Sequence, residues 1–311
     1  MYIKYYLRLI VIMSLLAACG QKNKNPHTDT QTSGIIKVSA DDSYEFLVDA
    51  EVYTFMQLNP DAKIIPTYKA EPDVFADFIN DSARVIFVNR ELNAAEKKHF
   101  DTIQITPKST LIGYDAIAFI VHKDNTDTNL TQGHIQLILK GQLTSWKQIN
   151  KKSELGNLQV VFDNPTSGNA RYFREKFNLQ KFSDNVQAAK NSRDVIKYVE
   201  ANKNAIGVIG VNLISDKDDS TSMSFLKNTR VVYLSEAQDT SMSHDFYPPL
   251  AGHVALREYP FWRNIYMIKR EPYLGLGTGF VNFCYYDKGQ DIIKLMGLVP
   301  ANKKLRVIRM K

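Results

Sequence analysis

The chain has 311 residues, a formal net charge of +6 and scattered Lys and Arg residues, so nothing in its composition indicates a nucleic-acid-binding surface. Hydrophobic residues make up 44% of the chain, enough for a sizeable core. Only two cysteines are present, which excludes a disulfide-rich scaffold.

The first nineteen residues combine a basic start, a short apolar run and a cysteine. Lys4 and Arg8 precede an almost entirely apolar run from Leu9 to Ala18, and no acidic residue occurs before Cys19. The run is shorter than the roughly 20 residues of a membrane span, so it predicts a cleaved secretory signal over residues 1–18. The small residues before Cys19 resemble the bacterial lipobox, in which the cysteine carries a diacylglycerol. The alternative is an ordinary signal with an incidental cysteine.

Residues 19–34 are expected to be a lipidated Cys19 followed by a flexible tether, because residues 20–34 contain no aliphatic or aromatic side chain. This predicts a membrane-anchored lipoprotein of the cell envelope that faces the periplasm. Loss of Lys4 and Arg8 leaves 37 basic and 33 acidic residues, a net charge of +4 that suits a small anionic ligand. The remaining cysteine, Cys284, lies in an apolar stretch and is interpreted as a buried small hydrophobe.

The first part of the folded region alternates strand-like and helix-like segments. Asp42 and Glu45 have the spacing of a capping box, and Asn93 is a candidate N-cap. The expected strands are Ile35–Ser39, Ala62–Tyr68 and Arg84–Val88, and the expected helices are Ser43–Leu58, Asp73–Asn80 and Asn93–Phe100.

The second part continues the alternation. A polar loop is expected over Asp216–Ser224. The expected extended segments are Asp115–His122, Leu158–Phe162, Ala205–Val211, Tyr247–Leu256 and Ile265–Ile268, and the expected helices are Thr131–Leu139, one that follows Gly168, Asp194–Glu200 and Gly289–Met296. Strands that alternate with helices predict an α/β fold with a mostly parallel sheet.

The strand–turn–helix segment at 158–177 carries the clearest candidate site. A helix start offers free backbone N–H groups to an anion. Ser167 and Asn169 can donate from their side chains, and Gly168 lets an oxyanion approach the backbone. The alternative interpretation is an ordinary helix N-cap without a ligand.

Two further segments carry candidate ligand-binding residues. Ser43 lies at a second strand-to-helix turn, and Arg90 follows a buried strand, where α/β folds bind ligands. The alternative for Arg90 is a surface ion pair with Glu91 or a neighbour. Arg171 and Arg193 are additional candidates for compensating the charge of an anion.

Signatures of enzymes and metal sites are poor. The six His residues show no metal-ligand spacing, and the chain has no G-x-S-x-G motif. The glycines of 275–279 do not form a G-x-G-x-x-G motif, and Ser167 has no evident base. The sequence therefore predicts no catalytic residue, no metal and no cofactor.

Five segments in order resemble the phosphate ABC transporter substrate-binding proteins, the PstS-like group of periplasmic binding proteins. Each is weak alone, but their order is specific. They are Gly113–Val121, Ile138–Trp146, Val160–Asn169, Asn204–Gly210 and Gly275–Leu298.

The resemblance implies a two-lobed periplasmic-binding-protein-like fold of type II, in which each lobe is a mixed, mostly parallel sheet flanked by helices. Lobe 1 would comprise residues 35–117 and 247–311, and lobe 2 residues 118–246. The ligand would lie in the cleft between lobes that close by a hinge motion.

Carried over by position, Ser167, Gly168 and Asn169 match the family's Ser-Gly-Thr ligand loop, and Ser43 matches its first-loop hydroxyl residue. Three positions depart from the pattern. The family's arginine near this loop is replaced by Asp163, the acid that accepts the phosphate proton falls at Arg90, and the second-loop serine is missing from residues 69–71.

These features lead to one main hypothesis and two others. The main one is a monomeric, lipid-anchored protein that captures phosphate or a related oxyanion for an ABC transporter permease, with no nucleic-acid partner. The second is a binding-protein-like sensor or surface module without a transport role. The third, an enzyme of the phosphatase type, lacks any supporting motif.

Overall fold

The computed structural model describes residues 29–215 and 220–306. The predicted signal peptide and Cys19 lie outside this range. No helix in the described ranges is long and apolar enough to cross a membrane.

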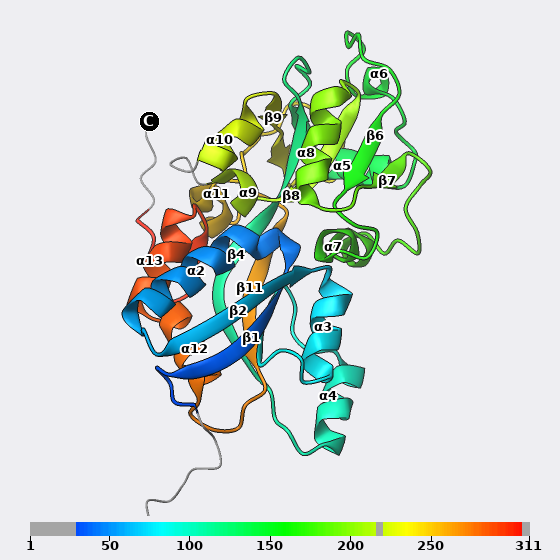
Figure 1. Ribbon diagram of the computed structural model, residues 1–311. Helices are drawn as coiled ribbons and strands as arrows, with labels where there is room; N and C mark the ends of the chain where they lie inside the picture. Colours follow the sequence, from blue (N-terminus) through cyan, green and yellow to red (C-terminus); the bar gives the residue numbers. More distant parts are fainter. Residues whose placement is uncertain (1–28, 216–219, 307–311) are drawn as a thin grey trace, which may run out of the picture.

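One continuous mixed sheet runs through the molecule (Figure 1). Its strand order is β2-β1-β3-β11-β4-β8-β6-β7. The bounds are β1 Gly34–Asp41, β2 Ala62–Lys69, β3 Val85–Val88, β4 Lys108–His122, β6 Gln159–Phe162, β7 Val186–Ala188, β8 Ala205–Gly210 and β11 Trp262–Lys269.

Strand β4 joins two lobes. Its residues 108–116 pair with β11, whereas residues 117–121 pair with β8. We call the part with β2, β1, β3 and β11 lobe 1 and the part with β8, β6 and β7 lobe 2. The outer strands of each lobe are parallel, and the strands that join the lobes run antiparallel. The predicted two-lobed, mixed α/β fold is confirmed.

Helices cover both faces of the sheet in lobe 1. The alternation of strand β3 decides which core each residue enters, because successive side chains point to opposite faces. Val85 and Phe87 belong to the core under α2 and α12, and Ile86 and Val88 to the core under α3 and α4. The helices of this lobe are α2 Glu45–Leu58, α3 Glu71–Ile79, α4 Ala94–Thr102, α12 Leu276–Tyr285 and α13 Asp287–Leu295.

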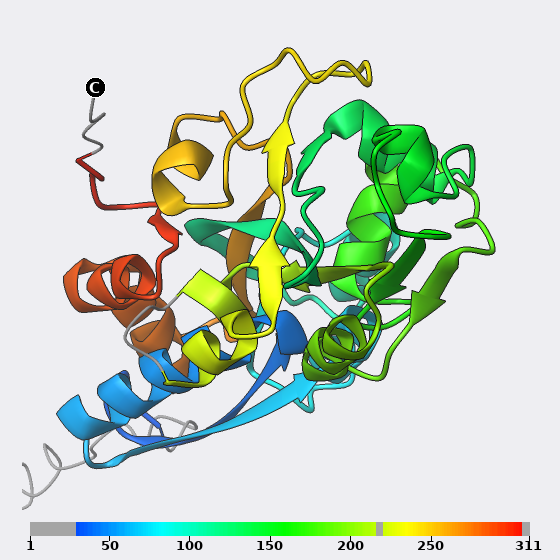
Figure 2. The ribbon, with the colours of Figure 1, turned by 90° about the horizontal axis from the view of Figure 1, so that it is seen from above.

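Shorter elements complete the second lobe and the connections between the lobes. Figure 2, which views the molecule from above, shows α7 beside the end of β2, so that this helix lies at the boundary between the lobes. The remaining elements are η2 Asp42–Tyr44, β5 Asn129–Thr131, α5 Gln132–Leu139, α6 Trp146–Ile149, α7 Gly168–Lys176, α8 Ser192–Ala201, α9 Asn212–Ser215, α10 Ser220–Leu226, β9 Thr229–Val231, β10 Tyr233–Ser235, α11 Ala251–Ala255 and β12 Val299–Pro300.

An aromatic cluster fixes the position of α7. The ring of Phe173 lies 5.5 Å from that of Phe119 in β4 and 4.9 Å from that of Phe261, in edge-to-face geometry. All three side chains are buried. Edge-to-face aromatic pairs add to the free energy of apolar burial, so α7 is held against the strands that join the lobes.

Most predicted elements are confirmed, and several local predictions are wrong. Asn93 caps α4 in a capping box, as expected. At the start of α2, however, Asp41 rather than Asp42 accepts the bond from the Ser43 N–H. Part of the expected polar loop forms α10, and the segment expected to be extended at Tyr247–Leu256 contains α11.

The described end of the predicted tether is bound to lobe 1. The Asp29 carboxylate accepts hydrogen bonds from the Tyr273 hydroxyl and the Leu276 N–H, both at 2.9 Å. The backbone of Gln31 packs against Gly279, where a Cβ atom would overlap it. Residues 29–34 therefore belong to the fold although they carry no aliphatic or aromatic side chain.

Glu51 is an acid inside the lobe 1 core. It is fully buried on α2, and neither carboxylate oxygen has a hydrogen-bond partner among the described residues. Cys284 is also buried, as predicted from its apolar surroundings. Burial raises the pKa of Glu51 well above its ordinary value, so the folded protein holds the proton more tightly than the unfolded chain does.

We expect Glu51→Gln to remove a pH-dependent loss of stability. The raised pKa stabilises the fold fully only below the unfolded pKa, and stability is lost as pH rises through the folded value, by at most about 1.4 kcal/mol per pH unit. Urea unfolding at pH 5 and pH 8 should show a smaller decline for Glu51→Gln than for the native protein. Glu154→Gln, at an exposed position, is the control, and equal declines in all three proteins would contradict the prediction.

Candidate functional site

The carboxyl ends of lobe 1 strands meet the start of α7 from lobe 2. Asp41 ends β1, Asn89 follows β3, and Glu71 begins α3 shortly after β2. Ligands of open α/β sheets bind outside such strand ends. We call Asp41, Glu71, Asn89, Asp163 and the 167–171 segment the buried polar cluster.

The start of α7 is a capped helix N-terminus, which both interpretations of the sequence expected. Ser167 is the N-cap, and its Oγ accepts a hydrogen bond from the Ala170 N–H at 3.1 Å. The first N–H groups of the helix have no partner within it. A Cβ atom on Gly168 would lie 2.3 Å from Asn89 Nδ2 and 2.9 Å from Asp41 Oδ2, so any larger residue would force these two side chains to move.

Arg171 joins the two lobes. Its guanidinium donates to both oxygens of Glu71, at 2.6 and 3.1 Å, and also to Asn89 Oδ1. Arg90 donates to Glu71 at 3.3 Å and to both oxygens of Glu96 at 2.8 Å. Both predicted cations are thus present in the cluster, and both are paired with carboxylates.

Asp41 connects Ser43 to the cluster. The Ser43 hydroxyl donates to Asp41 Oδ1 at 2.6 Å. The other oxygen, Oδ2, and the Asn89 Nδ2 are buried without a partner among the described residues. Burial raises the pKa of Asp41, and the charge of Glu71 raises it further. The cluster therefore contains one acceptor and one donor that the protein leaves unsatisfied.

Arg263 of β11 is a buried cation that the sequence did not reveal. It is 3% exposed, donates from Nε to Asp115 at 3.1 Å, and donates to Asn169 Oδ1 at 2.6 Å. Asn169 in turn donates to Asp163 at 2.7 Å. Burial lowers the pKa of Arg263, but the charge and hydrogen bond of Asp115 together with the charges of Tyr44 and Asp41 outweigh burial and raise this pKa above its ordinary value.

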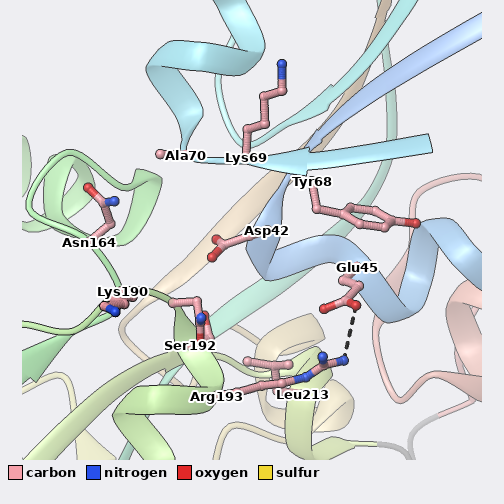
Figure 3. Close-up of a pocket in the computed structure, with 11 residues that line it drawn as sticks. Asp42, Glu45, Tyr68, Lys69, Ala70, Asn164, Lys190, Ser192, Arg193 and Leu213 are labelled. Carbon is pink, nitrogen blue, oxygen red and sulfur yellow. Dashed lines mark hydrogen bonds and ion pairs between the residues drawn. The ribbon is translucent and has the colours of Figure 1, made fainter.

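The cluster adjoins a pocket of about 290 Å³ between the lobes (Figure 3). Asp42, Ala70 and Asn164 line it, and each is the chain neighbour of a cluster residue. Lys190 and Arg193 add positive charge, and Figure 3 shows Arg193 paired with Glu45 of α2. Lys69 also lines the pocket, but its ammonium group pairs with Asp77 and points away in Figure 3. The pocket therefore lies next to the cluster, although no residue of the cluster lines it.

Carboxylates outnumber arginines in and beside the cluster. Burial raises the pKa of Asp163 to about 6, against the hydrogen bond of Ser167 that lowers it. Burial, together with Asp41 and Asp163, raises the pKa of Asp42 to about 8. Asp42, and to a smaller extent Asp163, is therefore protonated near neutral pH. This protonation limits the electrostatic repulsion between the cluster and an anion.

The structure brings the predicted ligand-binding residues together. Ser43, Arg90, Ser167, Gly168, Asn169 and Arg171 all lie in or against the cluster. Arg193 lies at the pocket instead. Sequence reasoning missed Asp41, Glu71, Asn89 and Arg263. Asn89 directly follows the predicted strand Arg84–Val88, and Asp41 lies two residues beyond the predicted strand Ile35–Ser39, so this signal could have revealed them.

No group of three or more His, Cys, Asp and Glu side chains in the described ranges could hold a metal ion. The groups present are hydrogen-bond donors, acceptors and fixed charges. Such an arrangement suits reversible binding of a small polar ligand.

Comparison with known proteins assigns the family. Residues 25–288 match the model of the PBP superfamily domain. The phosphate-binding protein PstS of Bacillus subtilis is 23% identical over 306 residues, which cover 95% of this chain and 92% of that protein. PstS of Borreliella burgdorferi is 21% identical over 278 residues, 85% of this chain and 89% of the relative. These relatives are binding proteins rather than enzymes.

A solved structure has the same fold. A Clostridium perfringens protein, described as a phosphate ABC transporter substrate-binding protein and solved with bound phosphate, superposes with a TM-score of 0.72 at 22% identity, covering 86% of this chain and all of that one.

We expect Asp115→Asn and Arg263→Met each to lower the free energy of unfolding by about 3 kcal/mol, because each leaves a buried partner uncompensated. The double variant should lose clearly less than the sum of the single variants. Urea unfolding of the four proteins measures this coupling, and strictly additive losses would show that the pair is not energetically linked.

Proposed function

This chain belongs to the PBP superfamily, and from that premise we propose that it captures phosphate or a related oxyanion between its lobes and delivers it to an ABC transporter permease. The observation that carries the proposal is the start of α7. There Ser167, Gly168 and Asn169 face the strand ends of lobe 1, with Arg171 beside them.

The charges support an oxyanion although the family's loop arginine is replaced by Asp163. Arg90, which follows β3, and Arg263 are the two candidates to compensate for this replacement. Arg90 lies against Glu71 and Glu96, whereas Arg263 reaches Asn169, the direct neighbour of Asp163 in the cluster. We therefore propose that Arg263 supplies the positive charge that replaces the family's loop arginine. Arg90 remains a second cation near Glu71.

Asp41 supplies the acceptor that the sequence did not reveal. Its unpartnered Oδ2 lies against Gly168, where an anion at the helix start would approach. A carboxylate there accepts a hydrogen bond from a protonated oxyanion and repels one without a proton. Hydrogen phosphate fits this arrangement better than sulfate.

The membrane context extends the proposal. Residues 1–18 would be a signal peptide, and a lipid on Cys19 would hold the monomeric protein at the periplasmic face of a membrane, close to its permease. We keep the lobe boundaries 117/118 and 246/247 as a proposal; the change of partner of β4 after Ala116 supports a crossing close to the first of them.

A sensor or surface module without a transport role is the second candidate. The pairing of Arg171 and Arg90 with Glu71 favours it, because the cations already have carboxylate partners. Failure of the purified protein to bind phosphate at millimolar concentrations would favour this candidate over a transport role.

We expect calorimetry to show phosphate binding to the purified protein from residue 29 onward. Arg171→Ala and Arg90→Ala should weaken binding by about tenfold or more, the loss of one charge-assisted hydrogen bond. Arg193→Ala is the matched control, since Arg193 is half-exposed and lies outside the cluster. Equal effects of all three changes would contradict the assignment of the cations.

We also expect phosphate to bind at least about tenfold more tightly than sulfate at pH 8, with the ratio reduced in Asp41→Asn. Because the pKa of Asp41 is raised, the ratio should fall as pH decreases and Asp41 takes up a proton. Competition titrations at pH 8 and pH 5.5 measure it. A preference for phosphate that survives in Asp41→Asn would show that another group accepts the proton.

A further inference from the structure

We propose that Glu71 is an internal counter-anion: its carboxylate occupies the oxyanion position between the lobes and keeps them closed until the ligand displaces it. The inference rests on the proposed function, because it concerns control of the same site.

The contacts of Glu71 are those of a bound anion. Its two oxygens accept from Nε and Nη2 of Arg171, at 2.6 and 3.1 Å, in the two-pronged geometry that arginine forms with carboxylates and phosphates. Arg90 donates to the same carboxylate at 3.3 Å. Arg90 and Arg171, the two arginines predicted from sequence to hold the ligand, therefore both donate to Glu71, in addition to their bonds with Glu96 and Glu175.

The place of the carboxylate is the start of α7. A Cβ atom on Gly168 would lie 3.1 Å from Glu71 Oε2, so this oxygen lies against the glycine that was predicted to let an oxyanion approach. The helix start attracts negative charge wherever it comes from. A phosphate oxygen and the Glu71 carboxylate thus compete for one position.

The contact also closes the cleft. Glu71 begins α3 in lobe 1, whereas Arg171 lies on α7 in lobe 2, and the Glu71 side chain is only 3% exposed. A second pair, Glu45 with Arg193, joins the same lobes, but its arginine is 47% exposed. A buried pair depends strongly on both partners and an exposed pair contributes little. Glu71 is therefore the stronger link between the lobes.

Displacement by phosphate exchanges one anion for another at the arginines. The released Glu71 can turn toward the pocket, whose lining includes its neighbour Ala70 and the cation Lys69. Affinity for the ligand is reduced by the stability of the internal pair. Removing the charge of Glu71 should thus strengthen binding, the opposite of what removal of a ligand-binding group does.

The test compares the native protein with Glu71→Gln, a variant of the same size without the charge. Calorimetry should show phosphate binding at least about tenfold tighter in Glu71→Gln. Small-angle X-ray scattering without phosphate should show a larger radius of gyration for the variant, which phosphate reduces. Glu71→Asp keeps the acid in the first turn of α3 but is one methylene shorter. Glu71→Asp should therefore also bind phosphate more tightly and have a larger radius of gyration without phosphate. It replaces Glu71→Gln in the test if Glu71→Gln does not fold.

Glu45→Gln is the matched control, because it breaks the exposed pair between the same lobes and should leave both readouts unchanged. Unchanged or weaker phosphate binding in Glu71→Gln overturns the proposal, since Glu71 would then be part of the ligand site. A gain in affinity without expansion overturns the closing role. If no variant binds phosphate, the proposed function is wrong, and scattering alone decides on Glu71: expansion supports the closing role and an unchanged radius overturns it.

Discussion

The buried charges between the two lobes are the constraint on which the rest of the structure depends. Arg171 and Arg263 are largely removed from water, and a guanidinium in that position needs carboxylate partners. Glu71 and Asp115 provide them from other elements of the fold. The Glu71–Arg171 pair links α3 of lobe 1 to α7 of lobe 2, whereas the Asp115–Arg263 pair joins β4 and β11 within lobe 1. The first pair therefore constrains how the lobes meet, and both pairs decide which charged groups remain unpaired.

The hydrophobic core places these charges. Alternating residues of β3 fill separate cores on the two faces of lobe 1, and the rings around Phe173 hold α7 against the strands that connect the lobes. Because the strands and α7 are fixed in this way, the carboxyl ends of the lobe 1 strands lie beside the start of α7. At this place Asp163 is joined through Asn169 to the buried cation Arg263.

A site that contains several carboxylates can accept an oxyanion only if some of the carboxylates are protonated and others are paired with arginines. Burial raises the pKa of Asp163 to about 6 and that of Asp42 to about 8, so protonation offsets part of the negative charge near neutral pH. The unpartnered oxygen of Asp41 favours a ligand that brings its own proton. The same electrostatics allow Glu71 to act where an anion is expected, since the arginines bind any carboxylate or phosphate that reaches them.

The sequence by itself determined the local features: alternating strands and helices, the helix caps at Asn93 and Ser167, and the family-like order of segments. These depend on periodicity and on neighbours in the chain, which a sequence displays. Only the tertiary structure decided the partners. Glu71 and Arg171 are 100 residues apart, and Arg263 is 94 residues from Asn169. No local pattern encodes such a pair, because it forms only when the chain crosses between the lobes, returns and brings distant charges into one space shielded from water.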